Sequence, residues 1–193
     1  MKNYFFAAAV AAMGFAVSAA ETEGLVFHED FESVKVNSKG VAYMPEWYPP
    51  AKMKEDCEVI ATREKENVCS GKYSYKLTNA SEKNLIYMLN SKKTVKVPAK
   101  DEKLVLTLKA KGTGSFLIAF VNYTENNKFL VTVSASPIKG KTAIPDKKHP
   151  FDDAPWQTCY GEFTKFPEGA AKCNMAIFVH PKSEIVLYRK SVV

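Results

Sequence analysis

Residues 104–123 read LVLTLKAKGTGSFLIAFVNY, and this stretch decides the fold class. Apolar residues occupy every second position in both of its halves: Leu104, Leu106 and Leu108, then Phe116, Ile118 and Phe120. A period of two is typical of β-strands, because successive side chains of a strand point to opposite faces of the sheet. In the second half the intervening residues are apolar too, which predicts a strand that is covered on both faces or lies centrally in its sheet.

The same period recurs along most of the chain, and no amphipathic helix of useful length is found. We expect strands at the following residues: 25–32, 41–44, 57–62, 73–78, 84–89, 94–97, 103–110, 114–123, 129–134, 156–163, 173–180 and 184–188. Two longer irregular stretches separate them, 45–55 and 137–155. Many short strands with regular turn signals predict an all-β fold, a jelly-roll β-sandwich of two antiparallel sheets.

The amino-terminal residues have the three-part pattern of a secretory signal. Lys2 supplies a positive charge, residues 4–20 carry no charge, and the small residues Ser18, Ala19 and Ala20 precede the polar chain. We interpret 1–20 as a cleaved signal peptide, with cleavage after Ala19 nearly as good, and 21–193 as a single β-sandwich domain. The competing interpretation, a membrane anchor, is disfavoured because the apolar run is shorter than the roughly 20 residues that span a bilayer. These features predict a secreted protein, extracellular or periplasmic, with no membrane span in the mature chain.

The overall charge is positive. The chain of 193 residues has a formal net charge of +6. This surplus is explained either by a solvated surface rich in lysine or by acidic partners such as uronic-acid or sulfated glycans. Nucleic acid is not expected as a partner, because the lysines are scattered and export removes the protein from most nucleic acid.

Four cysteines, an even number in an exported chain, favour disulfide bonds. They are Cys57, Cys69, Cys159 and Cys173. Three pairings are possible, and we favour Cys57–Cys69 with Cys159–Cys173 because each bond would close a short loop. A zinc site is disfavoured, since the cysteines and histidines do not have ligand spacing, and no metal or other cofactor is predicted.

Five segments occur in the order found in carbohydrate-binding modules of the β-jelly-roll type, the galactose-binding-like group. They are EDFE at 29–32, SGKYSYKL at 70–77, LVLTLKAKG at 104–112, WQ at 156–157 and IVLYRKSV at 185–192. The chain resembles that family over most of its mature length. The resemblance implies a jelly roll that binds carbohydrate without catalysis, with a glycan or polysaccharide as partner.

One position departs from the family pattern. The closing strand of such modules usually carries an aspartate that helps to hold a structural calcium ion, and Arg189 occupies that position here. A cation is unfavourable beside a site that needs several oxygen ligands. The resemblance therefore does not extend to a predicted calcium site, and Glu29 and Asp30 could pair with Arg189 instead.

Aromatic residues are the candidates for sugar contacts, because their flat apolar faces fit the C–H surface of a sugar ring. The strongest group is Trp47 and Tyr48, with Tyr43 nearby, in a proline-bounded stretch. The alternative for Trp47 is that its ring folds back onto the sandwich as a plug.

Two further candidates come later in the chain. Tyr123, with Asn122 beside it, forms the second candidate; the alternative is a tyrosine at a strand end, next to amides that serve a turn. Trp156 is the third, ranked lower because the family pattern usually packs this tryptophan structurally.

No sequence motif for catalysis is found: there is no GxSxG, no HExxH and no glycine-rich phosphate loop. The leading hypothesis is a secreted, non-catalytic, lectin-like domain. Two alternatives remain open. One is a structural or adhesive subunit that binds a protein partner through the same aromatic residues, and the other is a jelly-roll polysaccharide lyase.

Overall fold

The computed structural model describes residues 27–38, 40, 42–48, 56–99 and 102–192. The predicted signal peptide lies outside these residues. The strands are β1 (Phe27–Glu29), β2 (Lys35–Val36), β3 (Ala42–Tyr43), β4 (Trp47–Tyr48), β5 (Cys57–Thr62), β6 (Ser74–Asn79), β7 (Ile86–Lys96), β8 (Leu104–Gly114), β9 (Phe116–Tyr123), β10 (Phe129–Ser134), β11 (Phe151–Phe163), β12 (Lys172–Val179) and β13 (Ser183–Val192). A short 3-10 helix, η2 (Lys65–Asn67), follows β5. No helix in the described ranges is long and apolar enough to cross a membrane.

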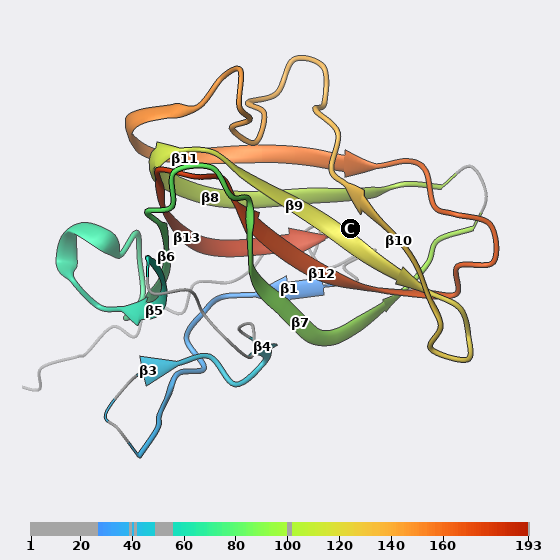
Figure 1. Ribbon diagram of the computed structural model, residues 1–193, viewed down its shortest axis with the longest axis horizontal. Coiled ribbons are helices and arrows are strands. Elements are labelled where there is room, and N and C mark those ends of the chain that lie inside the picture. The colour runs from blue at the N-terminus through green and yellow to red at the C-terminus, as the bar shows by residue number, and fades with distance from the viewer. Residues whose placement is uncertain (1–26, 39, 41, 49–55, 100–101, 193) are drawn as a thin grey trace, which may run out of the picture.

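The strands form two main sheets that lie one over the other (Figure 1). The six-stranded sheet has the order β11-β8-β13-β6-β5, with β1 paired to β13. The five-stranded sheet has the order β10-β9-β12-β7-β4, and β2 and β3 form a small separate sheet. Every pairing between these named strands is antiparallel. The predicted all-β jelly-roll sandwich of two antiparallel sheets is confirmed.

The core between the sheets follows the alternation in the sequence. Leu104, Leu106 and Leu108 of β8 are buried on the inner face of the six-stranded sheet. Phe116, Ile118 and Phe120 of β9 are buried on the inner face of the other sheet. Two sheets that each bury one apolar face stabilise one another by removing that area from water.

Gly112 shows why the turn-like KGTG stretch can nevertheless belong to a strand. Its backbone has a φ of 126° and lies so close to β13 that a Cβ atom would be 2.0 Å from the carbonyl oxygen of Glu184. Only glycine fits both constraints. β8 therefore continues through this position to Gly114.

The predicted disulfide bonds are wrong. All four cysteines are in the described part of the chain, and no disulfide joins any of them there. Cys57 begins β5, and its thiol lies 3.6 Å from Asn79 Oδ1 of β6, whereas the thiol of Cys69 lies 3.8 Å from the ammonium of Lys109 on β8. β13 lies between β6 and β8 in the sheet, so the two thiols are near different strands. A disulfide needs Cα atoms about 4.4–6.8 Å apart.

The second predicted pair, Cys159 and Cys173, lies on opposite sheets. Cys159 is on β11 of the six-stranded sheet, and Cys173 is on β12 of the five-stranded sheet. Both are fully buried in the core. The thiol of Cys173 is 3.6 Å from the carbonyl oxygen of Val95 on the neighbouring strand β7. Burial raises the pKa of Cys159 to about 11 and that of Cys173 to about 12, so both act as small apolar core residues.

Candidate functional site

Trp47 and Tyr48 are neighbours on β4, and their side chains lie on opposite faces of the five-stranded sheet. Trp47 points inward and is only 2% exposed. Its ring lies edge-on to Phe27 at a centroid distance of 6.2 Å, and its Nε1–H donates to Glu29 Oε2 at 3.0 Å. The indole is thus a plug at the edge of the core and presents no face to a ligand in this structure.

Glu29 and its acidic neighbours have structural hydrogen bonds. The second oxygen of Glu29 accepts from the backbone N–H of Phe31 at 2.9 Å, and Asp30 Oδ1 accepts from the N–H of Glu32 at 3.0 Å. Glu32 itself accepts from the N–H of Lys72 at 3.0 Å. Among the described residues there is no group of three or more His, Cys, Asp or Glu side chains that could hold a metal ion.

Tyr48 points outward and is 55% exposed. It is paired with Asn90 of β7, and the ammonium of Lys92 lies 4.7 Å from the centre of its ring. A tyrosine ring that is exposed, next to an amide and a lysine, combines an apolar face with several hydrogen-bonding groups. The Oδ1 atom of Asn90 is buried and accepts no hydrogen bond from the residues that the structure describes.

The register places Tyr48 at one end of a row of outward-facing residues that crosses all five strands. The row consists of Tyr48, Asn90, Ala176, Ala119 and Ser134. The two alanines in its middle have no exposed surface. Contacts with a ligand would therefore come from the ends of this row and from the rows beside it.

The next row is polar and open. It consists of Thr94 on β7, Asn174 on β12, Val121 on β9 and Thr132 on β10. Thr94 and Thr132 are exposed, and the other two are half-buried. Asn174 Nδ2 donates to the carbonyl oxygen of Ser91 at 2.8 Å, which fixes the orientation of the amide.

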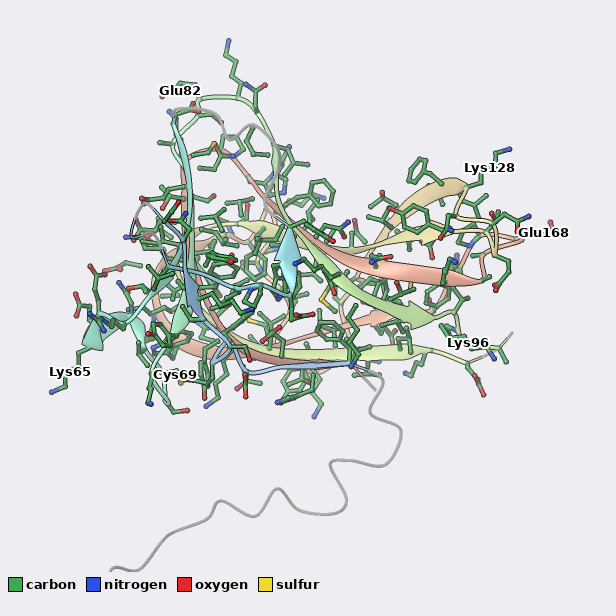
Figure 2. The ribbon with its side chains drawn as sticks, turned by 90° about the horizontal axis from the view of Figure 1, so that it is seen from below. Lys65, Cys69, Glu82, Lys96, Lys128 and Glu168 are labelled. Carbon is green, nitrogen blue, oxygen red and sulfur yellow. The ribbon has the colours of Figure 1, made fainter. Side chains whose placement is uncertain are left out.

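A second aromatic pair closes the far end of this outer face. Tyr123 is paired with Phe129, and their rings meet edge to face at a centroid distance of 6.3 Å. Phe129 is 56% exposed. Lys172 lies opposite Tyr123, and its ammonium donates to the carbonyl oxygen of Glu125 at 3.0 Å. Lys96 and Lys128, which flank this end, are labelled on the same side of the molecule in Figure 2.

The structure thus brings two of the predicted residues, Tyr48 and Tyr123, to one face. They are three strand spacings and four residues apart, which corresponds to roughly 20 Å. We call the outward-facing side chains of the five-stranded sheet, from Tyr48 to Phe129, the aromatic face. It can stack on sugar rings at both ends and offer amide and hydroxyl groups between them.

The other predicted site residues lie elsewhere. Asn122 is fully buried, and its Nδ2 donates to the carbonyl oxygens of Phe120 and Val131. Tyr43, 38% exposed, is on β3 of the small sheet. Trp156 is on β11 of the opposite sheet.

Trp156 is half-buried on the outer side of the six-stranded sheet. Its ring lies edge-on to Tyr188 of β13 at 6.3 Å, and the ammonium of Lys111 lies 5.8 Å from its centre. It therefore shares no surface with Tyr48, because the sandwich separates the two sheets' outer faces.

A hollow of about 450 Å³ lies beside the long connection between β10 and β11, which stands out above β11 in Figure 1. Asp146, His149 and Asp152 line it together with apolar residues. His149 and Asp146 are 3.3 Å apart, and backbone N–H groups of His149 and Lys148 lower the pKa of Asp146. Among its described lining residues the one Phe, Tyr or Trp is Phe151, which is almost fully buried.

Comparison with known proteins supports the fold. No protein-family profile matches the chain, and no curated protein matches its sequence. Solved structures do match. The CBM22-1 xylan-binding domain of Xyn10C from Paenibacillus barcinonensis has a TM-score of 0.51 and 12% identity, covering 87% of this chain and 92% of that one. The CBM22-1-CBM22-2 tandem domain of the same protein has a TM-score of 0.53 and 12% identity, covering 87% of this chain and 44% of that one.

A third match is the N-terminal part of xylanase Xyn10B from Clostridium thermocellum, which contains CBM22-1 and GH10 modules in complex with xylohexaose. It has a TM-score of 0.50 and 14% identity, covering 88% of this chain and 28% of that one. At these identities the likeness is one of fold. The predicted resemblance to jelly-roll carbohydrate-binding modules is confirmed at that level: the chain has the β-sandwich fold that these xylan-binding domains share.

Proposed function

We propose that this protein is a secreted, non-catalytic carbohydrate-binding domain that holds an extended glycan on the aromatic face. The observation that carries the proposal is the position of three outward-facing aromatic rings, of which Tyr48 and Phe129 are exposed and Tyr123 is half-buried. Tyr48 at one end and the Tyr123–Phe129 pair at the other lie on the same side of one sheet. Their separation of roughly 20 Å suits several linked sugars better than a single one.

The chemistry between the rings fits the same kind of ligand. Stacking on an aromatic ring removes the apolar C–H surface of a sugar from water, while the hydroxyl groups still need hydrogen-bond partners. Asn174, Thr94 and Thr132 lie between the rings and can supply them. The xylan-binding domains that share the fold support a polysaccharide as the ligand, and xylan is the first one to test.

The test is binding of the protein to a panel of neutral polysaccharides, xylan included, by affinity electrophoresis. Tyr48→Ala and Tyr123→Ala are each expected to weaken binding about tenfold, which corresponds to about 1.4 kcal/mol. Tyr43→Ala is the matched control, because Tyr43 is also exposed but lies on the small sheet. If all three variants are slowed by the polysaccharide as much as the unchanged protein, the aromatic face is not the binding site. Absence of binding to every glycan would contradict the function.

A further inference from the structure

A second hollow lies at the far side of the six-stranded sheet, where the chain passes from β5 to β6. Its volume is about 490 Å³, and residues 63–73 supply its lining. Three of these residues are cations: Arg63, Lys65 and Lys72. None of the lining residues is acidic, and Ser70 and Tyr73 add a hydroxyl group each.

The three cations, Arg63, Lys65 and Lys72, have no acidic partner among the residues that the structure describes. The nearest acids in the sequence are Glu64 and Glu66, and neither lines the hollow. Three positive charges around one hollow attract an anion, because no described acidic side chain lines it.

The loop that carries these cations is held in place from several sides. At one end, the Glu32 carboxylate accepts from the backbone N–H groups of Lys72, at 3.0 Å, and Tyr73, at 3.4 Å. Gly71 has a φ of 72°, and a Cβ atom there would lie 2.1 Å from Glu32 Oε1, so the turn requires glycine. Since these contacts are made before any ligand arrives, little ordering is left for the ligand to induce.

The other end of the loop is anchored to the six-stranded sheet. Ser70 Oγ donates to the hydroxyl oxygen of Tyr188, and the ammonium of Lys111 donates to the carbonyl oxygen of Glu66. Asn67, which is buried, donates to the carboxylate of Glu64 at 2.7 Å. These bonds connect the hollow to the surface that bears Trp156, since Lys111 also lies over that ring.

We infer that this basic hollow is a second binding site, one that takes the anionic group of an acidic polysaccharide, the carboxylate of a uronic acid or a sulfate ester. The inference rests on the proposed function, which makes the ligand a polysaccharide, and on the cations that line the hollow, which make it an acidic one. Lys65, which lines the hollow, and Cys69, which precedes Ser70 of its lining, lie at the opposite end of the molecule from Lys96 and Lys128 (Figure 2). The aromatic face and the hollow are therefore separate sites, and a substituted polysaccharide offers chemistry for both.

The experiment measures binding of the protein to polygalacturonate, dextran sulfate, uncharged dextran and a neutral xylan at low and moderate salt. The variant Arg63→Gln/Lys65→Gln/Lys72→Gln removes the three charges and keeps polar side chains. It is expected to bind one of the two acidic polymers at least about tenfold more weakly, because each exposed charge contributes a factor of about two to five. The salt dependence should fall with it, since fewer ions are released on binding. Polygalacturonate and dextran sulfate distinguish the carboxylate from the sulfate source.

The matched control removes three exposed lysines from other loops: Lys139→Gln/Lys148→Gln/Lys165→Gln. It has the same net charge as the first variant and is expected to bind the acidic polymers within about twofold of the unchanged protein. An equal loss in both variants would overturn the inference, because the effect would then be one of net charge. Competition by double-stranded DNA as effective as that by the acidic polymer would also overturn it.

Binding to neutral xylan separates this inference from the proposed function. It should be the same in both triple variants. If the protein binds neutral xylan but binds neither acidic polymer better than uncharged dextran, the basic hollow is not an anion site and the proposed function of the aromatic face is unaffected. If the protein binds an acidic polymer, the triple variant of the hollow loses that binding and no neutral glycan binds, the aromatic face is not a glycan site and the inference about the hollow is supported.

Discussion

Replacing Trp47 and Tyr48 one at a time should separate stability from binding, because the two residues are adjacent and face opposite ways. Trp47→Ala removes a fully packed indole and a hydrogen bond to Glu29. Loss of a buried tryptophan costs about 3–5 kcal/mol, against a total stability of about 5–15 kcal/mol for a domain. For a domain of this size, such a loss lowers Tm by roughly 10 °C. Tyr48→Ala changes an exposed side chain and should alter the free energy of unfolding by less than about 0.5 kcal/mol.

The assay is thermal unfolding followed by circular dichroism, with glycan binding measured well below each Tm. Trp47→Phe is an intermediate case: it keeps a ring in the core but loses the bond to Glu29, and about 1–2 kcal/mol of stability should be lost. The folded fraction of each Trp47 variant should keep its affinity, whereas Tyr48→Ala should lose affinity at unchanged Tm. A Trp47→Ala protein with unchanged Tm and lost binding would refute the assignment of the indole to the core.

Two further outcomes follow from buried groups. Without a reductant, the mass of the unfolded protein should correspond to four thiols, and in the folded protein Cys159 and Cys173 should resist alkylation at pH 8. With pKa values of about 11 and 12, the thiolate fraction there is about one in a thousand or less; a mass lower by two or four hydrogens would contradict this. Asn79→Ala should lower the free energy of unfolding by about 2–3 kcal/mol in urea titrations, because its buried amide donates to the carbonyl oxygen of Val179 on the other sheet at 2.8 Å and accepts from Ser81. An unchanged urea midpoint would show that this link between the sheets is not needed.

The regular strands could be predicted from the sequence, because the alternation of residues along each strand indicates which side chains face the core and which face outward. β8 and β9 are the clearest cases. β7 was harder, since a shift in register between its pairing at Asn90 and at Thr94 interrupts the alternation. The sequence therefore predicts two strands, 84–89 and 94–97, where the structure has one, Ile86–Lys96. From sequence alone, an interruption of the two-residue period caused by a register shift looks the same as a turn, and the pairing with the neighbouring strand is needed to distinguish them.

The candidate site was predictable only in part for a related reason. β4 has two residues and is a strand because it pairs with β7. No local pattern predicts so short a strand, so the sequence could not say which of Trp47 and Tyr48 points inward. The pairing decides it, because alternate residues of a strand face opposite ways. For Asn122 the local pattern was available but its polar side chain suggested an exposed position. It lies two residues after Phe120 on β9, so it faces the same way as Phe120 and is buried.

The acidic stretch at residues 29–32 connects the fold to the charge of the surface. By sequence, Glu29 and Asp30 could pair with Arg189, and no calcium site was predicted. In the structure Glu29 holds the Trp47 indole, Asp30 closes its own turn, and Glu32 accepts from backbone N–H groups of the loop that carries Lys72. Glu32 therefore shapes the basic hollow through the backbone and forms no ion pair with its cations. The acids nearest the hollow thus form hydrogen bonds within the chain, and the cations that line it remain available to an anionic ligand.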